Sequence, residues 1–262
     1  MPPTEQVQLS ATIAPLGEPA DACAWLAEQG VRGVQLSATQ PATRPRDLGA
    51  SARRDIRSMV QRLGLEVSGI DLWIPPEHFL DPANAERAVD AVRHACSFAS
   101  FLGRVPVALA FPAAPAAEDP RAALHADAAR AVTAAAAHEG VRLAVAPETL
   151  APLATPPAGA LIDPAAVLAA GGDPAAAVAK AAGTLVAARV VDLLRSGLRG
   201  PVGAGSEARL DLTAYRVALE LAGVRLLPVV DARQWPQPRP GLLQSVQAWI
   251  DAVPALGARP SR

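Results

Sequence analysis

Short apolar runs alternate with amphipathic segments along the chain, and several of these runs end in a carboxylate. The runs VRLAVAPE, ALID, LVAARVVD and VRLLPVVD end at Glu148, Asp163, Asp192 and Asp231. A parallel strand that is covered by helices on both faces of its sheet is apolar throughout. A carboxylate at its tip must meet water, a metal ion or a substrate, because burying an unpaired charge is costly. Several such tips facing the same way are typical of the catalytic face of a barrel of alternating strands and helices.

The alternation predicts eight strands, seven full helices and a (β/α)8 TIM barrel. The expected strands are 7–13, 31–36, 66–70, 104–111, 142–146, 160–162, 185–191 and 224–230, and the expected helices are 20–29, 52–63, 83–102, 121–139, 174–182, 212–222 and 242–252. Prolines 152, 156 and 157 leave room for only a loop or one turn after the fifth strand, so helix five should be shortened or missing. The length of 262 residues suits one such barrel, and a single domain over residues 1–262 is expected.

The composition narrows the classes of partner and chemistry. The 24 basic and 25 acidic side chains give a net charge of −1, so nothing favours nucleic acid or an anionic membrane as a partner. No run of about 18 apolar residues is free of charge and proline, so no membrane span is expected. Lys180 is the single lysine and falls in an expected outer helix, which argues against Schiff-base chemistry.

The cysteines give an expectation for the compartment. Cys23 and Cys96 have neither metal-binding nor disulfide spacing, and buried free thiols suit a reducing environment. The N-terminal residues lack the basic-then-apolar pattern of a secretion signal. We therefore expect a cytoplasmic protein. The sequence leaves open whether it forms a homo-oligomer.

Polar residues at the expected strand ends supply the candidate chemistry. They are Asp71, Trp73 and His78 after the third strand, Glu148, Asp163 and Arg189 from the fifth to the seventh, and Asp231 and Trp235 after the eighth. Converging carboxylates can bind a divalent cation through oxygen or act as a general acid and base pair. The two tryptophans are candidates for stacking on a sugar ring, although packing is the commoner role of this side chain.

The carboxylates also have purely structural interpretations. Glu148 and Asp163 can pair with Arg189 or Arg195 and close the top of the barrel. Asp163 directly precedes a proline and can cap the following helix, and Asp192 can be a cap or a solvated loop residue.

The loop GPVGAGS, residues 200–206, is a candidate phosphate cradle. Its backbone N–H groups could wrap an anion, and Arg195, Arg199 and Arg209 flank it. Glycines in a long turn are more commonly just turn residues, so both interpretations stay open.

The histidines argue against a zinc centre. His94, His125 and His138 fall in expected outer helices, and His78 alone lies in a strand-end loop. A site built from several histidines is therefore not expected.

The order of these segments resembles the sugar phosphate isomerase/epimerase family, the xylose-isomerase-like TIM barrels. The resemblance runs from about residue 7 to 252 and is carried first by GVRGVQL and LGLEVSGID. It is sharper in VRLAVAPE, in LIDPAAVLAAGGDPAAAVAKAAGTLVAARVVDLL and in GAGSEARLDLTAYRVALELAGVRLLPVVD. It implies a TIM barrel that acts on a small sugar-like molecule, with no nucleotide cofactor.

The resemblance also implies one divalent cation, Mn, Mg, Co or Zn, held by a glutamate, an aspartate, a histidine and a glutamate. The matching positions are Glu148, Asp163, Arg189 and Asp231. Arg189 departs from the pattern because a guanidinium has no lone pair to give a metal. Asp231 is a shorter carboxylate than expected, and Gln35 replaces the glutamate often seen on strand two.

Two functions follow from these expectations. The first is a sugar or sugar-phosphate isomerase or epimerase in which Glu148 and Asp231 move a proton on the substrate. The second is a non-catalytic barrel that has lost the family's metal site and binds a ligand or a partner protein. A DNA-repair endonuclease of the same barrel type would need several histidines for a metal cluster and a basic groove. Three of the four histidines fall in expected outer helices and the net charge is −1, which argues against this function.

Overall fold

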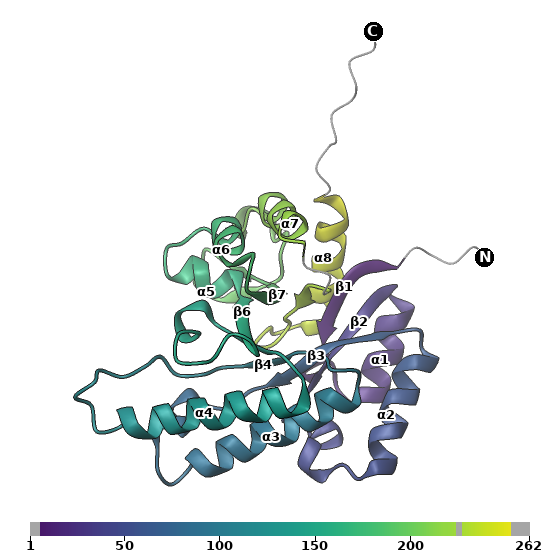
Figure 1. Ribbon diagram of the computed structural model, residues 1–262. Helices are drawn as coiled ribbons and strands as arrows, with labels where there is room; N and C mark the ends of the chain where they lie inside the picture. Colours follow the sequence, from purple (N-terminus) through teal and green to yellow (C-terminus); the bar gives the residue numbers. More distant parts are fainter. Residues whose placement is uncertain (1–5, 224–226, 253–262) are drawn as a thin grey trace.

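Eight parallel strands close into a barrel at the centre of the molecule (Figure 1). The computed structural model describes residues 6–223 and 227–252. Around the barrel the strands follow the order β1-β10-β7-β6-β5-β4-β3-β2. They are β1 (Val7–Thr12), β2 (Val31–Ser37), β3 (Glu66–Leu72), β4 (Val107–Leu109), β5 (Leu143–Val145), β6 (Ala158–Ile162), β7 (Leu185–Val190) and β10 (Val229–Val230).

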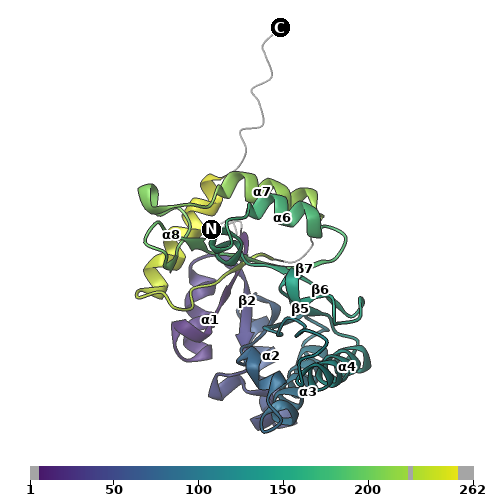
Figure 2. The same ribbon diagram turned by 90° about the vertical axis from the view of Figure 1, so that its left-hand side faces the viewer.

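The helices lie outside the strands, as Figure 2 shows from the side. They are α1 (Pro19–Glu28), α2 (Ala50–Arg62), α3 (Ala85–Phe101), α4 (Ala122–Glu139), α5 (Pro164–Ala169), α6 (Pro174–Ala181), α7 (Leu212–Leu221) and α8 (Pro238–Asp251). The long helices α3 and α4 pack against each other on one side of the barrel, and α6 packs against α7 on another. The predicted TIM barrel is confirmed.

The connection between β5 and β6 differs from the other strand-to-strand connections. It contains the short 3-10 helix η5 (Pro147–Thr149) and no α-helix among its described residues. The prolines of this segment lack the N–H that an internal helical hydrogen bond requires. The expectation of a shortened or missing fifth helix is therefore confirmed.

Two local features differ from the expectation. The strand predicted at 104–111 is confined to β4 because the chain before it turns through Arg104, which has a left-handed φ of 62°. The segment predicted as a plain loop after β7 contains a hairpin, in which β8 (Asp192–Leu193) pairs antiparallel with β9 (Arg199–Gly200). The eighth strand was predicted at 224–230, of which 224–226 lie outside the described residues.

Apolar side chains from strands and helices form the core around the barrel wall. At Gly159 in β6 the neighbouring chain comes so close that a β-carbon would lie 2.4 Å from the carbonyl oxygen of Thr184. This close approach explains why the position is occupied by glycine. Cys23 and Cys96 are buried free thiols. In the described part of the chain, no helix combines the length and the apolar character that a bilayer span requires.

Candidate functional site

Three aspartates and three arginines meet at the carboxyl ends of the barrel strands. We call these residues the Asp–Arg cluster: Asp71, Asp163, Asp231, Arg189, Arg199 and Arg233. The apolar strands deliver them because each strand buries its length and leaves its polar tip at the mouth of the barrel. Three carboxylates and three guanidiniums give the cluster a formal charge of zero.

Asp231 lies at the centre of the cluster and is fully buried. Its Oδ2 accepts hydrogen bonds from Arg189 Nη1 at 2.7 Å, Arg199 Nη2 at 3.0 Å and Arg233 Nη2 at 2.8 Å. Its Oδ1 accepts from Arg233 Nε at 2.8 Å and from the backbone N–H of the same residue at 3.3 Å. A carboxylate has about four lone-pair sites, so Asp231 is saturated by protein donors.

Arg189 connects its own strand to residues at the ends of three other strands of the barrel. It belongs to β7, and besides Asp231 it donates from Nη2 to Asp71 Oδ1, at the end of β3, at 2.9 Å. Its Nε lies 3.8 Å from Asp163 Oδ2, which follows β6. The buried hydroxyl of Tyr215 on α7 donates to the backbone carbonyl of Arg189 at 2.9 Å and fixes this part of the strand. The arginine is therefore held from the barrel wall and from the helix behind it.

The β8–β9 hairpin brings Arg199 over the mouth. Its Nη1 and Nη2 donate to the two oxygens of Asp163 at 3.1 and 3.0 Å, which is the paired geometry that a guanidinium and a carboxylate favour. Asp163 also caps α5 by accepting the backbone N–H of Ala166 at 3.3 Å. Both structural interpretations of Asp163, capping and pairing with arginine, are thus confirmed, although the partners are Arg199 and Arg189 rather than Arg195.

The charges of the cluster stabilise one another electrostatically. Burial alone would raise the pKa of Asp231, but the charge of Arg189 and the contacts with Arg233 and Arg199 hold that pKa well below its usual value. Burial alone would lower the pKa of Arg189, but the charges of Asp231, Asp71 and Asp163 raise it above its ordinary value. Arg189 and Asp231 therefore both keep their charge at neutral pH, because each faces side chains of the opposite sign.

A cavity of about 540 Å³ opens at the mouth of the barrel next to the cluster. Its polar lining includes Asp163, Arg189, Arg199 and Arg233, and the rest of its lining consists largely of alanine and leucine side chains from the ends of β3, β4, β5 and β6 and from α5. Trp73, whose side chain is 59% exposed, stands at its edge. The size and the mixed lining are typical of a small-molecule site.

The backbone at Gln234 is strained. This residue follows Arg233 in the wall of the cavity and has φ of 68°, a conformation that a side chain such as glutamine rarely adopts. Strained positions of this kind cluster at ligand sites, where the surrounding structure holds them in place. Arg233, the residue before it, donates to both Asp231 and Asp71.

The residues present do not fit a divalent cation. Among residues 6–223 and 227–252, no group of three or more histidine, cysteine, aspartate or glutamate side chains is arranged to hold a metal ion. The oxygens of Asp71, Asp163 and Asp231 already accept hydrogen bonds from guanidinium groups. A cation inserted here would meet three positive charges within a few ångströms, and this repulsion opposes binding.

Glu148 lies apart from the cluster. The chain leaves β5 at Val145 and turns into η5, where the Glu148 side chain is exposed and makes no hydrogen bond or ion pair with another described residue. Ala146, two residues earlier, still lines the cavity. The expected metal set of Glu148, Asp163 and Asp231 is therefore not assembled by the described residues.

The other predicted substrate-binding residues divide into three groups. Asp71 and Trp73 line the cavity, together with Arg189. His78 is half-buried on the 3-10 helix η4 (Pro76–Leu80) and faces a neighbouring hollow instead. Trp235 is buried and packs against Gly241 of α8, where an added β-carbon would lie 2.7 Å from its ring, so it belongs to the core rather than to the cavity wall.

Several remaining candidates have structural roles. Asp192 is buried and accepts the backbone N–H groups of Arg209 and Leu210 at 3.0 to 3.3 Å, which ties down the end of the Gly-rich loop. Burial raises the pKa of Asp192, and these backbone hydrogen bonds oppose the rise. Arg195 donates from Nε to the carbonyl of Ser206 inside the same loop. The Arg195 side chain and the backbone N–H of Arg209, both near the expected phosphate cradle, therefore already donate hydrogen bonds within the protein.

Arg199 and Arg233 complete the cluster, and neither was assigned to the candidate site from the sequence. Arg199 was considered only as a residue that flanks the Gly-rich loop. For Arg233 the signal was its position two residues after Asp231, whereas no local pattern connects Arg199 with Asp163. An arginine that follows a buried carboxylate closely is a candidate for its partner.

Comparisons with known proteins agree with this architecture. The family model of the xylose isomerase-like TIM barrel matches residues 23–252. The structure of the xylose isomerase domain protein from Planctomyces limnophilus superposes with a TM-score of 0.72 at 18% identity, covering 96% of this chain and 98% of that one. No curated protein matches the chain.

Two further solved structures are similar at low identity. A sugar phosphate isomerase/epimerase from Parabacteroides distasonis ATCC 8503 has a TM-score of 0.68 and 13% identity over 97% of this chain and 96% of its own. D-Psicose 3-epimerase from Clostridium cellulolyticum H10, solved with D-tagatose, has a TM-score of 0.72 and 12% identity over 92% of this chain and 96% of its own. At these identities the likeness establishes the fold, whereas the family model spans most of the sequence. The chain therefore belongs to the xylose isomerase-like TIM barrel family.

Proposed function

We propose that the protein binds a small sugar-like molecule in the barrel mouth without a metal ion. The observation that carries this proposal is the saturation of Asp231 by Arg189, Arg199 and Arg233 at the position where the family resemblance implies a metal ligand. The guanidiniums supply the positive charge there, and their N–H groups are directional donors that suit hydroxyl and carbonyl oxygens. Trp73 offers an aromatic face at the edge of the cavity.

The cluster supports binding better than proton transfer. A general base needs a free lone pair and a pKa near the working pH. Asp231 has neither, because its oxygens accept hydrogen bonds from three arginines and its pKa lies well below the usual value. Both oxygens of Asp163 are likewise engaged by Arg199.

An isomerase or epimerase without a metal is the second candidate, and the family membership favours it. In this alternative Arg189 and Arg199 stabilise the negative charge that develops on a substrate carbonyl oxygen, as oriented donors do in other enzymes. A base removes the proton from the adjacent carbon and leaves an enediolate. In an isomerase the proton is added to the former carbonyl carbon while a proton moves between the two oxygens, and in an epimerase a proton is added to the opposite face of the same carbon. Glu148 is the free carboxylate nearest in sequence to the cavity wall, two residues after Ala146.

Deuterium exchange separates the two candidates. Purified protein is incubated with D-tagatose, xylose and ribulose in D2O, and the sugars are examined by NMR for deuterium next to the carbonyl carbon. The binding proposal expects no incorporation, whereas incorporation that disappears in Glu148→Gln would establish the isomerase alternative instead.

Binding is measured in parallel by calorimetry with the same sugars. We expect Arg199→Gln and Trp73→Ala to weaken the interaction and Arg130→Gln, an exposed change on α4, to leave it unaltered. Failure of every sugar to bind the unaltered protein would overturn the proposal.

A further inference from the structure

A second hollow lies beside the barrel mouth, between the loop that follows β2 and helix α3. It consists of two adjoining cavities of about 210 and 380 Å³, whose walls share Arg46, Ile74, Ala91 and His94. We call this hollow the side groove. Trp73 lines both the larger of these cavities and the barrel-mouth cavity, so the two sites meet at the end of β3.

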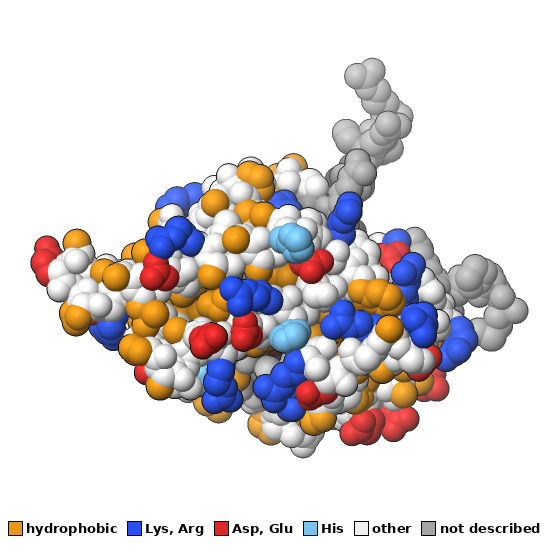
Figure 3. Space-filling view, turned by 60° about the horizontal axis from the view of Figure 1, so that its bottom comes forward, with side chains coloured by type: hydrophobic (Ala, Val, Ile, Leu, Met, Phe, Trp, Pro, Cys, Tyr) orange, Lys and Arg blue, Asp and Glu red, His pale blue; other side chains and the backbone are white. Residues whose placement is uncertain are grey.

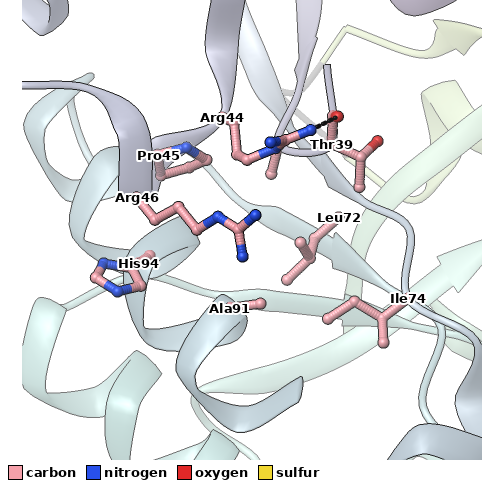
Figure 4. Close-up of a pocket in the computed structure, with 9 residues that line it drawn as sticks. Thr39, Arg44, Pro45, Arg46, Leu72, Ile74, Ala91 and His94 are labelled. Carbon is pink, nitrogen blue, oxygen red and sulfur yellow. Dashed lines mark hydrogen bonds between the residues drawn. The ribbon is translucent and has the colours of Figure 1, made fainter. Parts of the chain in front are cut away.

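The walls of the side groove carry three arginine and two histidine side chains. Arg44 and Arg46 come from the loop after β2, Arg87 and His94 from α3, and His78 from η4. Figure 3 shows this face of the molecule, on which blue arginine, red acidic and pale-blue histidine side chains lie close together. In Figure 4 the guanidinium of Arg46 points into the smaller cavity, above the apolar side chains of Leu72 and Ala91.

The acidic residues near the groove do not cancel this charge. Asp47 is shared, because it lies 3.2 Å from Arg44 Nη1 and 3.6 Å from Arg46 Nε. Asp90, which lines the larger cavity, is paired with Arg93 at 2.6 Å. Asp81 accepts from Asn84 and from the backbone N–H of Ala83 and lines neither cavity. The groove therefore retains a net positive charge.

Arg46 and Arg87 are the arginines of this wall whose terminal donors have no hydrogen-bond partner among the described residues. Arg44 donates to the carbonyl of Thr39 at 3.4 Å and to Asp47, so its orientation is fixed by its own loop. The two Nη atoms of Arg46 contact no partner among the described residues. Such a planar fork matches two oxygens of a tetrahedral oxyanion at once.

We propose that the side groove binds a phosphate group, with the Nη fork of Arg46 as the principal donor and His94 and Arg87 as further donors. The apolar floor formed by Leu72, Ile74 and Ala91 removes water from one side of the anion and strengthens these contacts. The phosphate can be a free ion or belong to a small phosphate monoester whose remaining part reaches the barrel mouth past Trp73. The proposal does not depend on the proposed function, because the free ion requires the groove alone.

Calorimetry with inorganic phosphate at constant ionic strength tests the proposal. We expect Arg46→Gln to weaken phosphate binding about ten-fold, because it removes two charge-assisted hydrogen bonds, and the double change Arg46→Gln with His94→Gln to abolish it. Arg54→Gln is the matched control, since this exposed arginine of α2 is not part of the groove wall. All three positions are on the surface, so the variants should fold.

Two further arms locate the phosphate and its source. Arg199→Gln alters the barrel mouth and should leave phosphate binding unchanged. Glucose 6-phosphate is compared with glucose and inorganic phosphate: tighter binding of the ester supports a monoester ligand, and equal binding supports the free ion. Absence of phosphate binding, unchanged binding in the double variant, or loss of binding in Arg199→Gln or Arg54→Gln would overturn the proposal.

Discussion

Arg189 Nη1 donates a hydrogen bond to Asp231 Oδ2 at 2.7 Å, and both residues are buried at the end of paired strands. The family resemblance implied a histidine at the first position and a metal between the two. The guanidinium of Arg189 lies in their place, where it carries a positive charge and donates hydrogen bonds to Asp231 and Asp71. The buried carboxylates are thereby neutralised by the protein itself.

Replacing Arg189 by methionine should destabilise the protein strongly. The change leaves Asp231 and Asp71 buried with fewer counter-charges, and breaking one side of a buried ion pair costs about 3–5 kcal/mol. Urea unfolding followed by circular dichroism measures the loss. Arg130→Met removes an exposed arginine that pairs with Asp127 and should change the free energy of unfolding by about 0.5 kcal/mol or less. Equal losses in the two variants would contradict this account of the cluster.

Metal affinity should increase as arginines are removed from the Asp–Arg cluster. Arg189→His supplies a possible ligand, but Arg199 and Arg233 still occupy the carboxylate oxygens. We therefore expect Mn²⁺, Co²⁺ or Zn²⁺ to raise the melting temperature of the double variant Arg189→His with Arg199→Gln, and to raise that of Arg189→His less. Stoichiometric metal in the unaltered protein, measured by mass spectrometry, would show that the guanidiniums do not exclude the ion.

The cluster should make the stability fall in acid. The pKa of Asp231 is lowered in the folded protein, whereas an unfolded aspartate has a value near 3.9. Between these values the unfolded state binds more protons, so the stabilisation is complete above about pH 4 and is lost as the pH falls through the folded value. Asp231→Asn should therefore reduce stability at pH 7, and its difference from the unaltered protein should shrink below about pH 4. A difference that stayed constant down to pH 2 would exclude this linkage.

The β8–β9 hairpin should loosen when Arg199 is changed. Its paired contact with Asp163 is a link between the hairpin and the barrel mouth. Arg199→Gln should accelerate thermolysin cleavage at Leu194 or Leu198, because local opening exposes the backbone to the protease. Mass spectrometry of the fragments identifies the site. Arg195→Gln, which removes a contact within the same loop to Ser206, should have a smaller effect.

The sequence by itself determined the barrel. The apolar runs and the amphipathic segments between them can be buried only as strands inside helices. The prolines after Pro147 excluded a regular fifth helix, and the carboxylates at Asp71, Asp163 and Asp231 marked the mouth. These features are local, so they can be read from neighbouring residues.

The tertiary structure alone decided which charges meet. Arg199 reaches Asp163 across 36 positions and Arg233 reaches Asp71 across 162, and no local pattern encodes such pairs. Glu148 ends a run like the others, but η5 turns it towards solvent. The path of a loop and the direction of a side chain depend on the packing of the whole barrel, which is why the sequence showed where the polar tips lie but not how they pair.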